Sequence, residues 1–174
     1  MKKLMILAGL TMMSVIASAA TCNWYCGEIY DYVEPTAGDV NTGYTAYFFQ
    51  TADLTQEAAS TAIAKGDFSF LSLGFADDTT VADGELYGTT THGNGETVEG
   101  YAIVFNNAVP GSADHYYMTD IESATTGTSG QAANLSIDAS GSQTAANWQT
   151  IPEPTSGLLL LLGVAGLALK RKRA

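Results

Sequence analysis

The middle of the chain consists of short apolar, aromatic and β-branched segments separated by Gly, Asp and Asn. Segments of this kind between turn residues are typical of β-strands. The pattern predicts seven strands, at residues 28–33, 44–49, 68–73, 85–91, 97–105, 115–121 and 134–138. Gly93-Asn94-Gly95 between two of them predicts a hairpin turn. Short strands at near-regular spacing favour a mainly β fold, either a small antiparallel β-sandwich or a flattened barrel.

One stretch has helical periodicity instead. The apolar residues that recur on one helix face are Leu54, Ala58, Ala59, Ala62 and Ile63. Asp53 is a suitable N-cap, and Gly66 follows the last apolar position. We expect one α-helix over residues 54–65, packed on a face or an edge of the sheets, where it also protects that edge from pairing with another chain. A second short helical turn is expected over residues 144–149, with Trp148 tucked under the domain.

The N-terminal end has the order of a secretory signal peptide. It starts Met1-Lys2-Lys3, continues with an apolar run to Ile16 and ends in Ala17-Ser18-Ala19. A positive start, an apolar stretch of about a dozen residues and an A-x-A site define such a peptide. We therefore expect residues 1–19 to be a signal helix that signal peptidase removes after Ala19, with cleavage after Ala20 as the second choice. An uncleaved anchor is the alternative, but the run is shorter than the ~20 residues of a spanning helix.

The C-terminal end combines three features in a fixed order. Pro152-Glu153-Pro154 comes first, a Leu-, Gly- and Ala-rich uncharged run over residues 155–169 follows, and the chain ends in a basic tail. The cations of that tail are Lys170, Arg171, Lys172 and Arg173. As a helix the uncharged run would span roughly 22 Å, less than a hydrocarbon core of ~30 Å. The positive-inside rule keeps the tail cytoplasmic, which places everything before Pro152 outside the membrane.

This order resembles the PEP-CTERM sorting signal of bacterial exported proteins. The resemblance covers residues 151–174 and implies processing by an exosortase, an integral-membrane peptidase of the cysteine type. It also implies a membrane-anchored precursor and a destination at the cell surface or in its exopolysaccharide. The tail mixes Lys with Arg where the family favours Arg, and an ordinary tail anchor is the alternative. Residues 43–71 are weakly similar to the mature domains of other short PEP-CTERM proteins, which implies a recurring surface module without an assigned activity.

Charge separates the predicted mature domain, residues 20–150, from the two ends. Between Thr21 and Thr150 the chain has 17 acidic residues and one basic residue, Lys65, for a net charge of −16. Such a domain repels phosphate backbones and anionic lipid headgroups, which excludes nucleic-acid binding.

Two cysteines, Cys22 and Cys26, follow the predicted cleavage site. Export favours a disulfide between them, which would stabilise such a small loop by about 2 kcal/mol at best. Free or intermolecular thiols are the alternative. A metal site would need two more soft ligands, and the C-x-x-x-C spacing differs from the redox C-x-x-C motif.

The candidates for catalysis are weak. His92 and His115 are the only histidines, with Glu96 near the first and Asp114 near the second in the sequence. Neither a G-x-S-x-G elbow nor an H-E-x-x-H motif accompanies them. We therefore predict no catalytic residues and no resident cofactor.

One acidic loop is a weak candidate for calcium. Its carboxylates are those of Asp77, Asp78, Asp83 and Glu85. Calcium takes six to eight oxygen ligands, which such a loop can supply together with backbone carbonyls. The order does not match an EF-hand, because Thr79 and Val81 stand where carboxylates or amides belong, so a solvated acidic loop is the alternative.

Three function classes follow from these observations. The first is a non-enzymatic exported protein of the cell surface or extracellular matrix, structural or associated with exopolysaccharide, whose carboxylates divalent cations could bridge to the polymer. The second is a carbohydrate-binding module that uses exposed tyrosines, and the third is a small secreted hydrolase that uses His92 or His115. The tyrosines in predicted strands are expected mainly in the core: Tyr30, Tyr32, Tyr44, Tyr47, Tyr101, Tyr116 and Tyr117.

Overall fold

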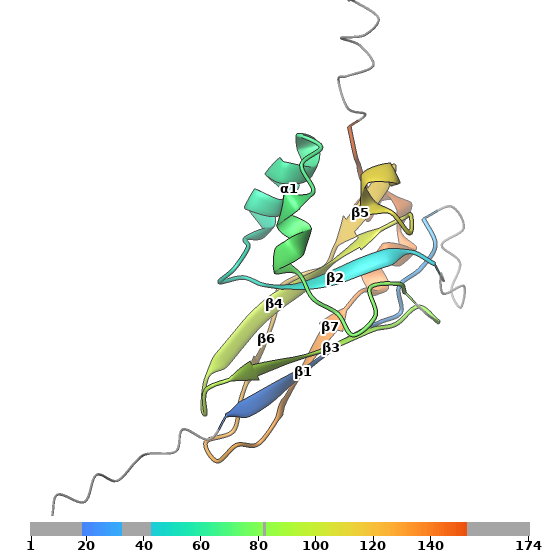
Figure 1. The fold of residues 1–174 in the computed structure, drawn as a ribbon. Helices are drawn as coiled ribbons and strands as arrows, with labels where there is room; N and C mark the ends of the chain where they lie inside the picture. The colour runs from blue at the N-terminus through green and yellow to red at the C-terminus, as the bar shows by residue number, and fades with distance from the viewer. Residues whose placement is uncertain (1–18, 33–42, 82, 153–174) are drawn as a thin grey trace, which may run out of the picture.

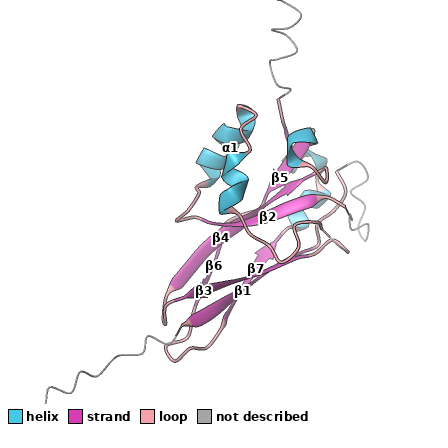
Figure 2. Ribbon diagram, viewed as in Figure 1, coloured by secondary structure: helices cyan, strands magenta, loops and turns pink. Residues whose placement is uncertain are grey.

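The computed structural model describes residues 19–32, 43–81 and 83–152. In this part of the chain two open β-sheets pack face to face, and a helical layer covers the outside of the larger sheet (Figures 1 and 2). The mainly β fold is confirmed, as a sandwich and not as a barrel, because neither sheet closes on itself. The predicted signal helix and C-terminal hydrophobic helix lie outside the described residues, within which no helix is long and apolar enough to span a bilayer.

The smaller sheet has the strand order β3-β1-β7, made of Leu86–His92, Ala20–Gly27 and Ala133–Asp138. The central strand β1 is antiparallel to β3, with Ala20 opposite His92 and Cys26 opposite Leu86. It is parallel to β7, so this sheet is mixed, and the β1–β7 pair is the exception to the predicted antiparallel pairing among the named strands. Buried and exposed residues alternate along β1 and β7, which is the pattern of strands with one face on the core and one in water.

The larger sheet has the order β2-β4-β5-β8, with β6 paired to the other half of β4. Its strands are β2 Thr45–Gln50, β4 Thr97–Phe105, β5 His115–Met118, β6 Glu122–Thr125 and β8 Gln149–Thr150. From Gly100 onward strand β4 is buried on both faces, because this part lies between two apolar cores. Val98, Ala102 and Val104 face the smaller sheet, and Tyr101 and Ile103 face the helical layer.

The helical layer consists of α1 (Gln56–Ala64) and the 3₁₀ helix η1 (Ser69–Leu73). Ala59 and Ile63 of α1 are buried against the outer face of β4. The helix prediction is confirmed, but the N-cap is Thr55 and not Asp53, because the Thr55 hydroxyl accepts a hydrogen bond from the Ala58 N–H.

Two predicted strands are wrong. Residues 28–32 are no strand beyond an isolated bridge at Tyr30, since Glu28 at φ 60° ends β1 and the segment bends away from the sheet. Residues 69–73 form η1, because Phe70 turns into the core beneath α1 instead of alternating across a sheet. Strands β1, β6 and β8 were not predicted, whereas the predicted turn near residue 145 is the 3₁₀ helix η4 (Ala145–Asn147), with Trp148 buried.

The chain leaves the domain at the edge of the larger sheet. After the short helices η2 (Pro110–Ser112) and η3 (Ser140–Gln143), strand β8 pairs with the start of β5. The Ile151 N–H donates to the Asp114 carbonyl oxygen at 2.8 Å, so the pairing extends beyond β8. At the other end Ala20 begins β1 and is fully buried, and cleavage after Ala19, which stays a prediction, would leave this strand whole.

Candidate functional site

Two exposed tyrosines form a pair on the outer face of the smaller sheet. Tyr25 of β1 and Tyr87 of β3 are directly opposite in the register, and their ring centroids are 5.2 Å apart with a tilt of 48°. The side chains are 36% and 49% exposed, in contrast to the core tyrosines. Both hydroxyls donate to the Glu85 carboxylate, from Tyr25 at 3.1 Å and from Tyr87 in a short hydrogen bond. The carboxylate therefore holds both rings in one orientation.

A glycine positions the first ring. A Cβ on Gly27 would lie 2.7 Å from the Cζ atom of Tyr25, so the tyrosine extends along β1 over a residue that has no side chain. The backbone of Gly27 has no positive φ, so the need for glycine here is close approach and not strain.

The hydrogen bonds to Glu85 also change the acidity of the phenols. The bond to the carboxylate raises the pKa of Tyr87 to about 12, because the neutral phenol is the better donor beside a negative charge. Partial burial, followed by the bond to Glu85, raises the pKa of Tyr25. Both hydroxyls therefore stay protonated donors at neutral pH.

The rest of this outer face is polar but almost uncharged. Its exposed strand residues besides the two tyrosines are Thr21, Asn23, Thr89, Thr91, Asn134, Ser136 and Asp138. Asn23 and Asn134 are opposite each other and share a side-chain hydrogen bond of 3.0 Å. The carboxylates of Glu85 and Asp138 lie at one end, so the remainder is a neutral strip in a strongly acidic domain. We call these residues, with Tyr25, Tyr87 and Glu85, the tyrosine face.

The tyrosines singled out from the sequence are not part of this exposed face. Tyr30, Tyr44, Tyr101, Tyr116 and Tyr117 are buried, and Tyr32 and Tyr47 are half-buried, which confirms their expected core roles. Tyr87 lies in the predicted strand over residues 85–91, but Tyr25 and its pairing with Tyr87 were missed because strand β1 was not predicted. The alternation of Cys22, Trp24 and Cys26 with polar neighbours was the signal that could have found it.

His92 lies in a hydrogen-bonded network at one end of the sandwich. Its Nε2 atom is 2.7 Å from the Thr90 Oγ1 atom, and its Nδ1 atom is 3.3 Å from a Glu96 carboxylate oxygen. Thr90 also accepts a hydrogen bond of 2.7 Å from the indole N–H of Trp24. The hydroxyl, imidazole and carboxylate stand in the order of a hydrolase triad, but the His92 side chain is only 6% exposed and Thr90 points toward the core. The network therefore links the turn between β3 and β4 to the buried side chain of Trp24.

Glu96 completes this hairpin. Its second carboxylate oxygen accepts the Gly93 N–H, and this bond, followed by the contact with His92, holds the pKa of Glu96 below its usual value. The charged carboxylate thus caps the turn.

His115 is the first residue of β5 and is stacked on Tyr32 with ring centroids 3.9 Å apart. Its Nδ1 atom is buried without a hydrogen-bond partner. Asp114, its neighbour in the sequence, is exposed, whereas His115 is half-buried. The structure does not bring the two histidines into one site, since they belong to different sheets.

Cys22 and Cys26 are free, buried thiols, so the expected disulfide is wrong for this fold. Both lie on the inner face of β1, four residues apart, where a strand separates their Cα atoms by about 13 Å. A disulfide needs Cα atoms within about 7 Å. Burial raises the pKa of both thiols, that of Cys26 to about 12, which makes them inert core residues.

The acidic loop does not form a calcium cage among the described residues. Within that part of the chain no three His, Cys, Asp or Glu side chains gather as metal ligands would. Asp78 accepts a hydrogen bond from the Thr80 N–H at 2.9 Å, and Glu85 accepts from the two tyrosines. Asp77 is exposed, and so is Asp83, which has a positive φ of 50°.

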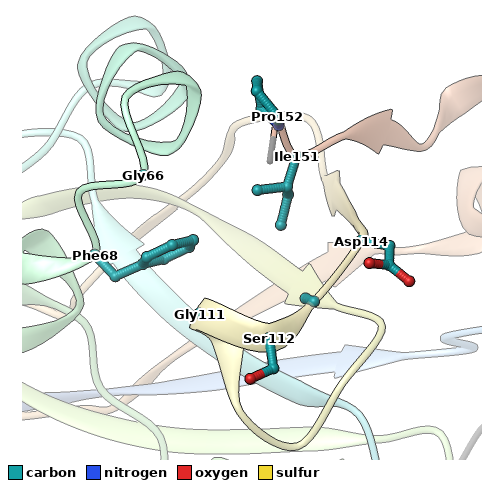
Figure 3. Close-up of a pocket in the computed structure, with 8 residues that line it drawn as sticks. Gly66, Phe68, Gly111, Ser112, Asp114, Ile151 and Pro152 are labelled. Carbon is teal, nitrogen blue, oxygen red and sulfur yellow. The ribbon is translucent and has the colours of Figure 1, made fainter. Parts of the chain in front are cut away.

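The region around the chain exit is hollowed on both sides of Pro152. Figure 3 shows the first hollow, of about 360 Å³, where Phe68 and Ile151 approach each other above the backbone of Gly111 and Ser112. The second, of about 540 Å³, lies between α1 and β8 and is lined by Glu57, Thr61 and Gln149 among others. Of the predicted sorting motif only Pro152 lies in the described residues; Glu153, Pro154 and the basic tail lie outside them.

Comparison with known proteins bears on this end of the chain. No curated protein matches the sequence. Among solved structures, a glycoside hydrolase family 15 glucoamylase from Hypocrea jecorina is similar at 16% identity with a TM-score of 0.39. The match covers 70% of this chain but 17% of the glucoamylase, and nothing about function follows from a likeness this low.

The family model of the PEP-CTERM protein-sorting motif matches residues 150–173. This confirms the resemblance drawn from the tripeptide, the apolar run and the basic tail. The chain carries a PEP-CTERM sorting signal, and it is an exported protein whose membrane-anchored precursor is a substrate of an exosortase.

Proposed function

We propose that the mature domain is a non-enzymatic surface protein that holds to exopolysaccharide through the tyrosine face. The observation that carries this proposal is the exposed Tyr25–Tyr87 pair, held by Glu85 beside an almost uncharged strip of sheet. Monomeric proteins keep aromatic surface in water at a cost, so an exposed aromatic pair with a fixed orientation marks a contact surface. The sorting signal supplies the location, because it delivers the domain to the outside of the cell.

The chemistry of the strip favours a neutral sugar polymer. Tyrosine rings offer apolar faces to the C–H groups of a sugar ring, and the neighbouring Thr, Asn and Ser side chains offer hydrogen bonds to its hydroxyls. From Thr21 to Tyr25 the strip runs about 13 Å along β1, which suits a linear polymer more than a small ligand. An anionic polymer would be repelled by a domain of net charge −16.

The state of His92 also supports a non-enzymatic role. Both ring nitrogens are within hydrogen-bonding distance of protein atoms, and the side chain is almost wholly buried. A general base must reach the substrate proton within hydrogen-bond distance, directly or through one water.

Polymer binding by the purified exported protein tests the proposal. Co-sedimentation with insoluble cellulose and affinity electrophoresis in gels containing the host's own exopolysaccharide give apparent affinities. We expect the double variant Tyr25→Ala/Tyr87→Ala to bind at least tenfold more weakly. The matched control is Leu73→Ala, which removes an apolar side chain that is 49% exposed on the helical layer.

Gly27→Ala is the sharper variant, because it leaves both tyrosines in place. The new Cβ would displace the Tyr25 ring, the mobile end of a side chain, so we expect weaker binding with little change in melting temperature. Equal binding by the wild type, by the double tyrosine variant and by Gly27→Ala would overturn the proposal, as would a wild-type protein that binds neither polymer.

A further inference from the structure

The sorting signal begins inside the folded domain, without a spacer. The motif match starts at Thr150, which is paired with His115 in the sheet. Ile151 follows with its N–H bonded to Asp114 and its side chain against the apolar core under α1. The first proline of the tripeptide, Pro152, is therefore held at the surface of the domain by the residue before it.

The reach of the chain then limits the distance to the membrane segment. Thr155, where the uncharged run starts, is three residues after Pro152. Three residues extend to at most about 10 Å. An integral-membrane peptidase that acts at this tripeptide thus has the folded domain within that distance, and its surface must fit the domain around Pro152.

The surface around Pro152 has two hollows that could accept side chains of a partner. Pro152 lines both hollows described above, the first of which is shown in Figure 3. One has an apolar floor of Phe68 and Ile151 and an exposed carboxylate, Asp114, at its rim. The other runs along α1 past Ala64 and Glu57. We call the residues that line the two hollows the exit face.

We propose that the exit face is the docking surface for the exosortase, so that the enzyme recognises the folded domain in addition to the tail. The partner surface that fits has apolar side chains for the floor of the first hollow and basic groups opposite Asp114 and Glu57. The exit face and the tyrosine face lie on opposite sides of the sandwich, because α1 and η1 cover the larger sheet while β1 and β3 form the other layer (Figure 1). A docked precursor thus keeps the tyrosine face free. The proposal rests on the sorting function and not on polymer binding.

Processing of the full precursor in its native host tests this docking. The measurement is the rate at which membrane-bound precursor is converted to the shortened form, followed by pulse-chase labelling and intact mass. Ala64→Arg and Ser112→Arg each place a long side chain at the rim of one hollow. Ala64 and Ser112 are both exposed. The matched control is Ala132→Arg, because Ala132 is also exposed and lies just before β7.

We expect at least fivefold slower processing for the two exit-face variants and a wild-type rate for Ala132→Arg, with equal melting temperatures. Glu153→Ala separates this proposal from the sorting function. If Glu153→Ala blocks processing while both exit-face variants are processed at the wild-type rate, the docking proposal is overturned and the sorting function stands. If Glu153→Ala itself is processed normally, the tripeptide is not read and the sorting function fails.

An insertion provides an independent check. Six Gly and Ser residues between Ile151 and Pro152 would leave the domain, the tripeptide, the apolar run and the basic tail unchanged but separate the domain from the tripeptide by up to about 20 Å. Docking predicts slower processing of this precursor, since the enzyme can no longer contact both at once. An unchanged or faster rate would mean that the domain is ignored or is an obstacle, and either result overturns the proposal.

Discussion

Gly100 of β4 is the position where the packing between the sheets is most easily tested. It lies on the inner face of the strand, and a Cβ there would overlap the six-membered ring of Trp24. It would also lie 2.7 Å from the carbonyl oxygen of Phe49, where an ordinary contact starts at about 3.4 Å. Gly100→Ala therefore requires both that the indole leaves its place and that the backbone of β2 moves by about 0.7 Å.

Neither movement is easy. The Trp24 indole is fixed by its hydrogen bond to Thr90 and by ring contacts with Phe48 and Phe75 at 5.6 and 5.0 Å. Overpacking of a dense core costs about 1–3 kcal/mol. With about 4 °C for each kcal/mol in a domain of this size, the melting temperature should fall by about 4–12 °C.

Thermal unfolding followed by calorimetry measures this change, and near-ultraviolet circular dichroism reports the indole environment. The control is Gly111→Ala, where the nearest atom to the new Cβ is on Phe68 at an ordinary 3.9 Å. We expect Gly111→Ala to melt close to the wild type. A Gly100→Ala protein that melts within about 1 °C of the wild type, with an unchanged aromatic signal, would refute the packing of Trp24 between the sheets.

Three further outcomes follow from buried or hydrogen-bonded groups. Native Cys22 and Cys26 should not react with a thiol reagent at pH 8 until the protein is denatured, since both are buried; an intact mass two hydrogens lighter would instead reveal a disulfide. Glu85→Gln should lower the pKa of Tyr87 from about 12 toward 10, because the raising hydrogen bond to a carboxylate is lost, and an unchanged phenolate absorbance titration would argue against that bond. Burial raises the pKa of Tyr101 to about 12, so its contribution to stability is complete below pH 10 and is lost as the pH rises toward 12. Urea unfolding across that range should show a shallower decline for Tyr101→Phe than for the wild type, and parallel declines would contradict the assignment.

Elements with a strong local period were predictable. Strand β4 has the bounds expected from its pattern, and α1 lies within the expected 54–65 because its apolar face repeats at helical spacing. The errors occur where a local pattern was weak or was outweighed by packing. Residues 69–73 have β-propensity, but Phe70 packs in the apolar core under α1. These tertiary contacts stabilise a 3₁₀ helix in place of a strand.

The candidate site was harder to predict than the fold. Tyr25 and Tyr87 are 62 residues apart, and their contact depends on the register between β1 and β3. The cysteines led to the opposite error, since a spacing of four residues suggests a closed loop until the backbone is known to be an extended strand.

The two ends of the chain need no fold to be understood. The sorting tail is an ordered run of proline, apolar residues and cations, so its residues by themselves specify processing, and the order of charge and apolar residues at the N-terminus predicts a signal peptide in the same way. The surface chemistry of the domain, in contrast, depends on the tertiary structure. Seven of the nine tyrosines are at least half-buried. Which two remain in water depends on whether each side chain lies on the packed face or on the solvent face of its sheet. That partition arises from contacts between distant segments, because burying an aromatic ring requires partners that its own strand cannot supply.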